Sequence, residues 1–200
     1  MEIYLIRHTT PNVAKGICYG QTDLGVTETF AEEASAISPY LPKQGVAVYS
    51  SPLQRCKKLA EALFPDQTVS LHPELMELNC GQWEMQEWNA IPKPEIEPWL
   101  NDFIHTPVPG GESYWQMHER VIKQFEQISQ KIEPTVIVAH GGVLRSIVAY
   151  ITGTSLKEAF DLFSFHYGCV VKITAPEKVP THEILYNVSL AGKEWHRPIR

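Results

Sequence analysis

Short apolar runs of strand length recur along the chain. Residues 2–6 (EIYLI), 45–50 (GVAVYS) and 135–140 (TVIVAH) are rich in β-branched and aromatic side chains. Continuous apolar runs of this length are typical of parallel strands that are covered on both faces. Residues 169–175 and 182–188 predict two further strands late in the chain, the second of them at an edge of the sheet.

Segments with helical character separate these strands. Residues 52–64 begin with a proline just after two serines that could cap a helix, and residues 141–153 predict another helix. Residues 112–132 place apolar side chains three or four positions apart: Val121, Phe125, Ile128 and Ile132. This alternation predicts an α/β protein, a three-layer α/β/α sandwich with a mostly parallel central sheet.

Residues 83–111 differ from the rest of the chain because five prolines interrupt them. This composition predicts an insertion with short helices that packs over one end of the sheet, where such excursions commonly line a substrate site. A chain of 200 residues can bury one sizeable core. We therefore expect residues 1–200 to form a single domain whose proline-rich insertion covers the active site.

Composition and charge exclude several classes of function. With 17 Lys+Arg against 23 Asp+Glu, the net charge of −6 argues against a broad surface for nucleic acid or an anionic membrane. The four cysteines lie far apart, without the spacing of a metal site or redox dithiol, which predicts buried free thiols in a reducing compartment. The N-terminus lacks the pattern of a signal peptide, and no apolar run approaches the roughly 20 residues of a membrane span. We expect a cytoplasmic location.

Charged and polar residues stand where two of the predicted strands end. Arg7 and His8 follow the first strand, and His140 ends the third, followed by two glycines. Ligands bind beyond the carboxyl ends of strands in open α/β sheets, so both histidines should lie at one edge of the sheet. A single histidine there is more often a buried structural residue, but the pair favours a functional site. Arg55, otherwise an ordinary solvated helix residue, adds a second guanidinium suited to bidentate contacts with phosphate.

Phosphoryl transfer at such a site also needs an acid. The segment ELMELNCGQWE offers Glu74, Glu77 and Glu84 near the start of the proline-rich insertion. Any one of them could instead be a solvent-exposed charge, and spacing alone does not choose among the three.

Five motifs in this order resemble the histidine phosphatase superfamily, the phosphoglycerate mutase-like proteins. They are LIRHTTP, SSPLQRCKKLAEAL, ELMELNCGQWE, PGGESYWQMHERV and VAHGGVLRSIVA, and together they cover most of the chain.

The resemblance implies a role for each matching residue. His8 becomes the nucleophile that forms phosphohistidine, and Glu77 becomes the acid that protonates the leaving alkoxide and then helps to activate water. Three groups would surround the phosphoryl oxygens and supply positive charge: Arg7, Arg55 and His140. The backbone N–H of Gly141 would add a donor at a helix N-terminus. With this charge in place, neither a metal nor a cofactor is expected.

Residues 9–27 (TTPNVAKGICYGQTDLGVT) resemble bacterial α-ribazole 5′-phosphate phosphatases of cobalamin assembly. Mutases carry patterns such as RHGxSxWN and ERHYG, which are not found here. Two departures from the phosphatase pattern stand out: RCKKLA replaces the more usual RAxxTA, and Met85 replaces the glycine that usually follows Trp-Glu.

These observations predict a metal-independent phosphomonoesterase that acts on a small phosphorylated substrate, with α-ribazole 5′-phosphate as the leading candidate. The alternatives are a phosphoglycerate mutase, a phosphatase of broader or protein phosphohistidine specificity, and a binding module that kept the pocket. A monomer or a homodimer is expected.

Several residues beyond the catalytic set are candidates for substrate contacts. Asn12 could equally be a turn former, Trp83 a hydrophobic anchor, and residues 110–113 a turn and helix cap. The full set of candidates is Arg7, Asn12, Tyr19, Gln21, Arg55, Trp83, Glu112, Ser113 and Gly141.

Overall fold

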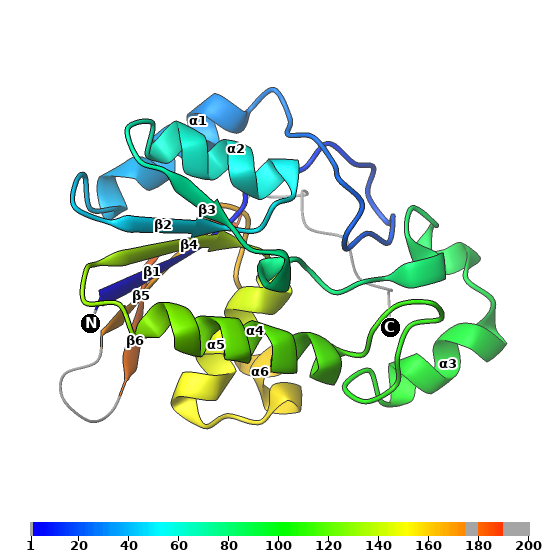
Figure 1. Ribbon diagram of the computed structural model, residues 1–200. Helices are drawn as coiled ribbons and strands as arrows, with labels where there is room; N and C mark the ends of the chain where they lie inside the picture. The colour runs from blue at the N-terminus through cyan, green and yellow to red at the C-terminus, as the bar shows by residue number, and fades with distance from the viewer. Residues whose placement is uncertain (1, 175–179, 190–200) are drawn as a thin grey trace.

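The computed structural model describes residues 2–174 and 180–189, and its centre is one six-stranded sheet (Figure 1). The strands are β1 (Glu2–Arg7), β2 (Ala47–Ser50), β3 (Val69–Leu71), β4 (Thr135–Ala139), β5 (Val170–Thr174) and β6 (Thr181–Tyr186). Their order is β3-β2-β4-β1-β5-β6. The pairs β3/β2, β2/β4 and β4/β1 are parallel, whereas β5 runs antiparallel to both of its neighbours. The predicted α/β class with a mostly parallel sheet is confirmed.

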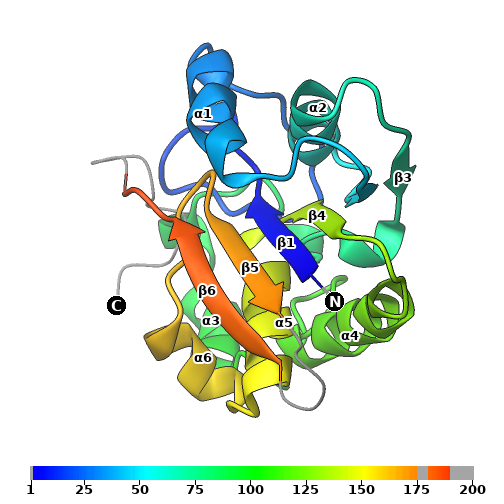
Figure 2. The same ribbon diagram turned by 90° about the vertical axis from the view of Figure 1, so that its left-hand side faces the viewer.

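Helices cover both faces of this sheet. They are α1 (Phe30–Ile37), α2 (Gln54–Leu63), α3 (Lys93–Asn101), α4 (Tyr114–Ser129), α5 (Gly141–Thr152) and α6 (Leu156–Leu162). Short 3-10 helices span Ser38–Tyr40, Pro73–Leu75, Gly81–Trp83 and Trp88–Ala90. Helices α1 and α2 lie on one face, and α4, α5 and α6 lie on the other, as the turned view in Figure 2 shows. The three predicted layers are present.

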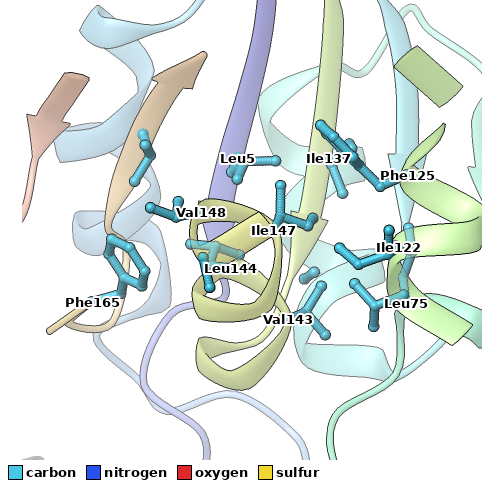
Figure 3. Packing of buried hydrophobic residues seen from close by; sticks show 14 of the residues in the cluster. Leu5, Leu75, Ile122, Phe125, Ile137, Val143, Leu144, Ile147, Val148 and Phe165 are labelled. Atoms are coloured by element: carbon cyan, nitrogen blue, oxygen red, sulfur yellow. The ribbon is translucent and has the colours of Figure 1, made fainter. Parts of the chain in front are cut away.

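The central strands are apolar throughout because both faces are covered. All five residues of β4 are buried. Along β1, Ile3 and Leu5 pack with α4 and α5, whereas Tyr4 and Ile6 pack with α1 and α2. Figure 3 shows the first of these two cores, in which side chains of α5 meet those of the sheet. Alternating side chains of one strand therefore stabilise two separate layers.

The predicted helix boundaries need two corrections. Helix α2 begins at Gln54 with Leu53 as its N-cap and has no side-chain cap, so the serines do not cap it. One of them, Ser51, instead forms a hydrogen bond with the side chain of His140. Helix α4 ends at Ser129, and Ile132 is 98% exposed, so the prediction that Ile132 lies on its buried face was wrong. Pro134 disfavours helical backbone just before it, and the chain turns there into β4.

The late strands form close to where they were expected. Strand β5 begins one residue after the predicted start at Cys169, and the predicted last residue, Ala175, falls outside the described residues. Strand β6 lies at the edge of the sheet, as predicted.

Among the strands and α-helices, three were not anticipated from the sequence: α1, β3 and α6. Strand β3 has only three residues, too few for a periodic signal. Helix α6 could have been found, because Ser155 and Glu158 form a capping box at its start.

The proline-rich segment begins at the last residue of the 3-10 helix Gly81–Trp83 and contains the 3-10 helix Trp88–Ala90 and α3. Two of its prolines fit the start of α3, since Pro92 precedes the helix and Pro94 lies in its first turn, whereas Pro98 lies inside the helix. Trp83, Trp88 and Trp99 pack together with ring centroids 5.8 to 6.3 Å apart, and Trp83 is 1% exposed. Trp83 is thus the hydrophobic anchor of this segment.

Met85 is the one non-glycine residue with a positive φ, 63°, among the described residues. A side chain in this left-handed region costs on the order of 1 kcal/mol, and the side chain of Met85 is half-exposed and gains little from packing. This conformation fits the glycine that the phosphatase pattern usually has after Trp-Glu.

We predict that Met85→Gly raises the free energy of unfolding by about 1 kcal/mol, because glycine adopts this conformation without a steric penalty. The matched control is Glu87→Gly, since Glu87 is exposed and has an ordinary φ of −68°. That change should lower stability by roughly 0.5–1 kcal/mol. Urea denaturation measures both, and a loss of stability in Met85→Gly would contradict this explanation.

Candidate active site

The parallel pairing of β1 with β4 brings the two histidines together. Arg7 lies opposite Ala139, and the N–H of His8 donates to the carbonyl of Ala139 at 3.0 Å. His140 follows β4 directly and occupies the N-cap position of α5. The imidazole centroids of His8 and His140 are 5.1 Å apart, which confirms that both histidines lie at one edge of the sheet.

His8 has a fixed orientation and tautomer. Its Nδ1 lies 2.7 Å from the carbonyl oxygen of Thr9. Since a carbonyl oxygen only accepts, Nδ1 carries the hydrogen, and in the neutral ring the lone pair is on Nε2. His8 lines a large cavity although it is only 2% exposed.

Arg7 lines the same cavity. One of its terminal nitrogens donates to the carbonyl of Phe165, and its Cζ lies 3.9 Å from the centroid of the Tyr167 ring. The hydroxyl of Tyr167 hydrogen-bonds that of Tyr19 at 2.8 Å, and both tyrosines line the cavity. The guanidinium of Arg7 is thus held by a carbonyl and an aromatic face at the cavity wall.

Arg55 lies deeper than the sequence suggested. It is fully buried, and its Nη1 and Nη2 donate to the carbonyls of Thr22 at 2.9 Å and Gly20 at 2.6 Å. Its Nε has no hydrogen-bond partner among the described residues. The guanidinium is 5.4 Å from the ring of Tyr19, which does line the cavity. Arg55 therefore stands behind the cavity wall.

His140 is fully buried, and its Nε2 lies 2.8 Å from Ser51 Oγ and 3.4 Å from Cys56 Sγ. Burial, followed by the positive charge of Arg55 and the neighbouring His8, lowers the pKa of His140 well below its ordinary value. His140 is consequently neutral at neutral pH. Without a bound phosphate it therefore adds no positive charge to that of the arginines, and its expected charge beside a phosphoryl group stays a prediction.

The structure separates the three candidate acids. Glu77 lines the cavity, Glu74 is exposed, and Glu84 lies outside the residues that line the cavity. The Glu77 carboxylate accepts from the N–H groups of Leu78 and Gly142, both at 3.0 Å. A Cβ atom at Gly142 would lie 2.2 Å from Glu77 Oε1, so glycine is required where α5 begins.

The remaining candidate contacts fall into two groups. Tyr19 and Gly141 line the cavity. Asn12 is exposed and does not, and Gln21 instead donates from Nε2 to the Glu77 carbonyl at 3.0 Å.

Glu112 and Ser113 have structural partners. Glu112 pairs with Arg120 at 2.5 Å, and Ser113 forms a capping box with Gln116 at the start of α4. The alternative that residues 110–113 form a turn and helix cap is confirmed.

The cavity has a volume of about 600 Å³. Besides Arg7, His8 and Glu77, its wall carries many aromatic side chains. Together with Tyr19 and Tyr167, these are Trp88, Trp99, Phe103, Tyr114, Phe160 and Phe165.

Sequence reasoning missed Arg145 in this wall. It is 5% exposed, donates from Nε to the Phe163 carbonyl at 3.2 Å, and lies over the Phe160 ring with 4.3 Å from Cζ to the centroid. Its position four residues after Gly141, on the same face of α5, was the available signal.

Within the described residues, no group of three or more His, Cys, Asp or Glu side chains is placed to hold a metal ion. Among the helices of residues 2–174 and 180–189, none has the length and apolar character needed to cross a membrane.

The model of the histidine phosphatase superfamily (branch 1) matches residues 3–187, so the chain belongs to this superfamily. It is accordingly a phosphoric monoester hydrolase of the histidine phosphatase type.

Relatives with different substrates resemble the chain. A metal-independent phosphoserine phosphatase of Arabidopsis thaliana is 36% identical over 168 residues, which are 77% of this chain and 70% of that protein. An adenosylcobalamin/α-ribazole phosphatase of Escherichia coli K12 is 29% identical over 197 residues, 92% of this chain and 95% of that protein. The crystal structure of an α-ribazole phosphatase from Shigella flexneri has the same fold, with a TM-score of 0.83, 24% identity and coverage of 92% and 95%.

The neutral state of His140 predicts a pH dependence of stability. In the unfolded chain a histidine takes up a proton near pH ~6.5, whereas native His140 does so only at lower pH. The unfolded state therefore binds more protons below that pH, and stability falls as the pH drops from 7 to 5. His140 should contribute up to about 1.4 kcal/mol per pH unit.

Urea denaturation of wild type and His140→Gln between pH 5 and pH 8.5 measures this contribution. Below pH 6.5, the free energy of unfolding of the variant should change less with pH than that of wild type. Above pH 7.5, the free energies of both proteins should change with pH in the same way. Equal slopes at low pH would contradict a neutral His140.

Proposed function

We propose that this protein is a metal-independent phosphomonoesterase that acts through phosphohistidine at His8 on a small phosphate ester. The observation that carries the proposal is the geometry of His8. The Thr9 carbonyl holds its Nδ1–H, which leaves Nε2 as the nucleophile, in a cavity that Arg7 and Glu77 also line.

In the first step, Nε2 of His8 attacks phosphorus, a P–N bond forms and the ester P–O bond breaks. Glu77 gives its proton to the departing alkoxide, which leaves as the alcohol. In the second step, water attacks the phosphohistidine, its proton passes to Glu77, and the P–N bond breaks. Inorganic phosphate leaves, and both His8 and Glu77 return to their starting states.

The positive charge for these steps comes from arginine. Arg7 contacts the phosphoryl oxygens directly, and Arg55 contributes its charge from behind the wall. The N–H of Gly141, in the first turn of α5, adds a donor where the helix favours an anion. Before substrate binds, His140 is a neutral hydrogen-bonding group, and a bound phosphate dianion would raise its pKa.

For the substrate, we propose α-ribazole 5′-phosphate, whose leaving alcohol carries a flat aromatic base. The aromatic wall of the cavity supports this choice, since stacked rings recognise such a base. Similarity to an α-ribazole phosphatase over most of both chains also supports it. The second candidate is phosphoserine, which the 36% identity to a phosphoserine phosphatase favours.

The proposal also covers the domain organisation, location and oligomeric state of the protein. Residues 1–200 would form one domain in which residues 83–111 cover the active site, and the place of Trp88 and Trp99 in the cavity wall supports this. The cytoplasmic location, and the monomeric or dimeric state, stay predictions.

The test compares kcat/KM for α-ribazole 5′-phosphate, phosphoserine and 3-phosphoglycerate. We expect α-ribazole 5′-phosphate to be preferred, and Trp99→Leu to reduce that preference by roughly tenfold because one ring contact is lost. Trp115→Leu is the matched control, since Trp115 is 43% exposed on α4 and does not line the cavity. His8→Ala should abolish turnover of every ester.

A preference for phosphoserine would overturn the choice of α-ribazole 5′-phosphate but not the phosphatase class. Phosphoryl transfer that depends on 2,3-bisphosphoglycerate would instead indicate a mutase.

A further inference from the structure

Glu84, one of the three candidate acids, does not line the cavity, and its carboxylate accepts five hydrogen bonds. Oε1 accepts from the N–H of Gln21 at 2.7 Å and of Cys80 at 3.2 Å. Oε2 accepts from the N–H of Gly20 at 3.0 Å and from the N–H and Oγ1 of Thr22 at 3.2 and 2.6 Å. One side chain thus joins the 20–22 loop to the segment that carries Glu77.

This arrangement needs an ionised carboxylate, because all five partners donate. Burial alone would raise the pKa of Glu84, but the hydrogen bonds from Thr22, Gln21 and Gly20 outweigh burial and lower it. Glu84 is therefore negatively charged at neutral pH.

The opposite side of the same loop holds Arg55. Its guanidinium donates to the carbonyls of Gly20 and Thr22, while the N–H groups of the loop face Glu84. The peptide unit between Gly20 and Gln21 accepts from Arg55 at its oxygen and donates to Glu84 at its nitrogen. A peptide polarised from both ends makes two stronger hydrogen bonds, so the positions of Glu84 and Arg55 are coupled through the backbone.

The loop also touches the acid of the site. Gln21 donates from Nε2 to the Glu77 carbonyl at 3.0 Å. A Cβ atom at Gly20 would lie 1.8 Å from the carbonyl oxygen of Leu78, so the loop and the segment that begins at Glu77 are in direct contact. Any shift of the loop would move the backbone that carries Glu77.

We propose that Glu84 is a positioning residue that fixes Arg55 and Glu77 through the 20–22 loop. The inference rests on the roles proposed for Arg55 and Glu77. Glu84 itself does not contact the substrate. Its charge holds the 20–22 loop in place, and the loop holds Arg55 and Glu77 in position at the phosphate site.

The experiment replaces Glu84 with an isosteric amide in the full chain. Glu84→Gln offers an NH₂ group to backbone donors, which cannot accept from it. We expect about tenfold weaker binding of inorganic phosphate, measured by calorimetry, and a fall in kcat of roughly ten- to a hundredfold. Glu87→Gln is the control, because Glu87 is exposed and its carboxylate makes no hydrogen bond or ion pair with the described residues; it should bind phosphate as wild type does.

A double-mutant cycle separates positioning from a loss of stability. If Glu84 acts through Arg55, then Glu84→Gln should change phosphate affinity less than about twofold in an Arg55→Met background. Full additivity of the two losses would overturn the proposal. Should Arg55→Met fail to fold, Thr22→Val removes one of the five hydrogen bonds and should weaken phosphate binding in the same direction as Glu84→Gln, but less.

The outcomes also separate this inference from the proposed function. Phosphatase activity that depends on His8, together with unchanged phosphate affinity and kcat in Glu84→Gln, would overturn the positioning role alone. A lower melting temperature with unchanged affinity and kcat would show that Glu84 only stabilises the fold. Wild-type protein without phosphatase activity would instead overturn the proposed function.

Discussion

The backbone pairing of β1 with β4 is the constraint on which the site depends. The ladder continues to the bond between the His8 N–H and the Ala139 carbonyl, so Arg7, His8 and His140 leave the sheet side by side. Both strands are buried on two faces. A shift in register by one residue would move each side chain into the hydrophobic core on the other face of the sheet. The stability of the core therefore fixes the spacing of the two imidazoles.

The charged side chains near that edge of the sheet lie at different depths from the cavity. Arg7 lines the cavity and Arg55 lies behind its wall, while the buried His140 is neutral because burial and the arginines disfavour its protonation. Glu84 places its negative charge on the far side of the 20–22 loop from Arg55. The loop peptides lie between these opposite charges, so the buried Arg55 has hydrogen-bond partners without a direct ion pair to the Glu84 carboxylate.

Part of this arrangement was predictable because its signals are local. Apolar strands that end in Arg7-His8 and in His140 indicated both the fold class and the shared edge, and the five motifs indicated the superfamily. The rest depends on contacts between distant segments. Spacing could not separate Glu77 from Glu84, since the distinction lies in which one reaches the N-H of Gly142. The neutral state of His140 and the burial of Arg55 are likewise properties of the packed molecule.

Detection of phosphate on His8 tests the central claim most directly. The protein is mixed with α-ribazole 5′-phosphate, quenched in alkali, in which phosphohistidine survives, and digested for mass spectrometry. The account predicts phosphate on the peptide that contains His8, and no phosphorylated peptide from His8→Ala. Steady turnover with no phosphate on His8, or with phosphate on another residue, would contradict it.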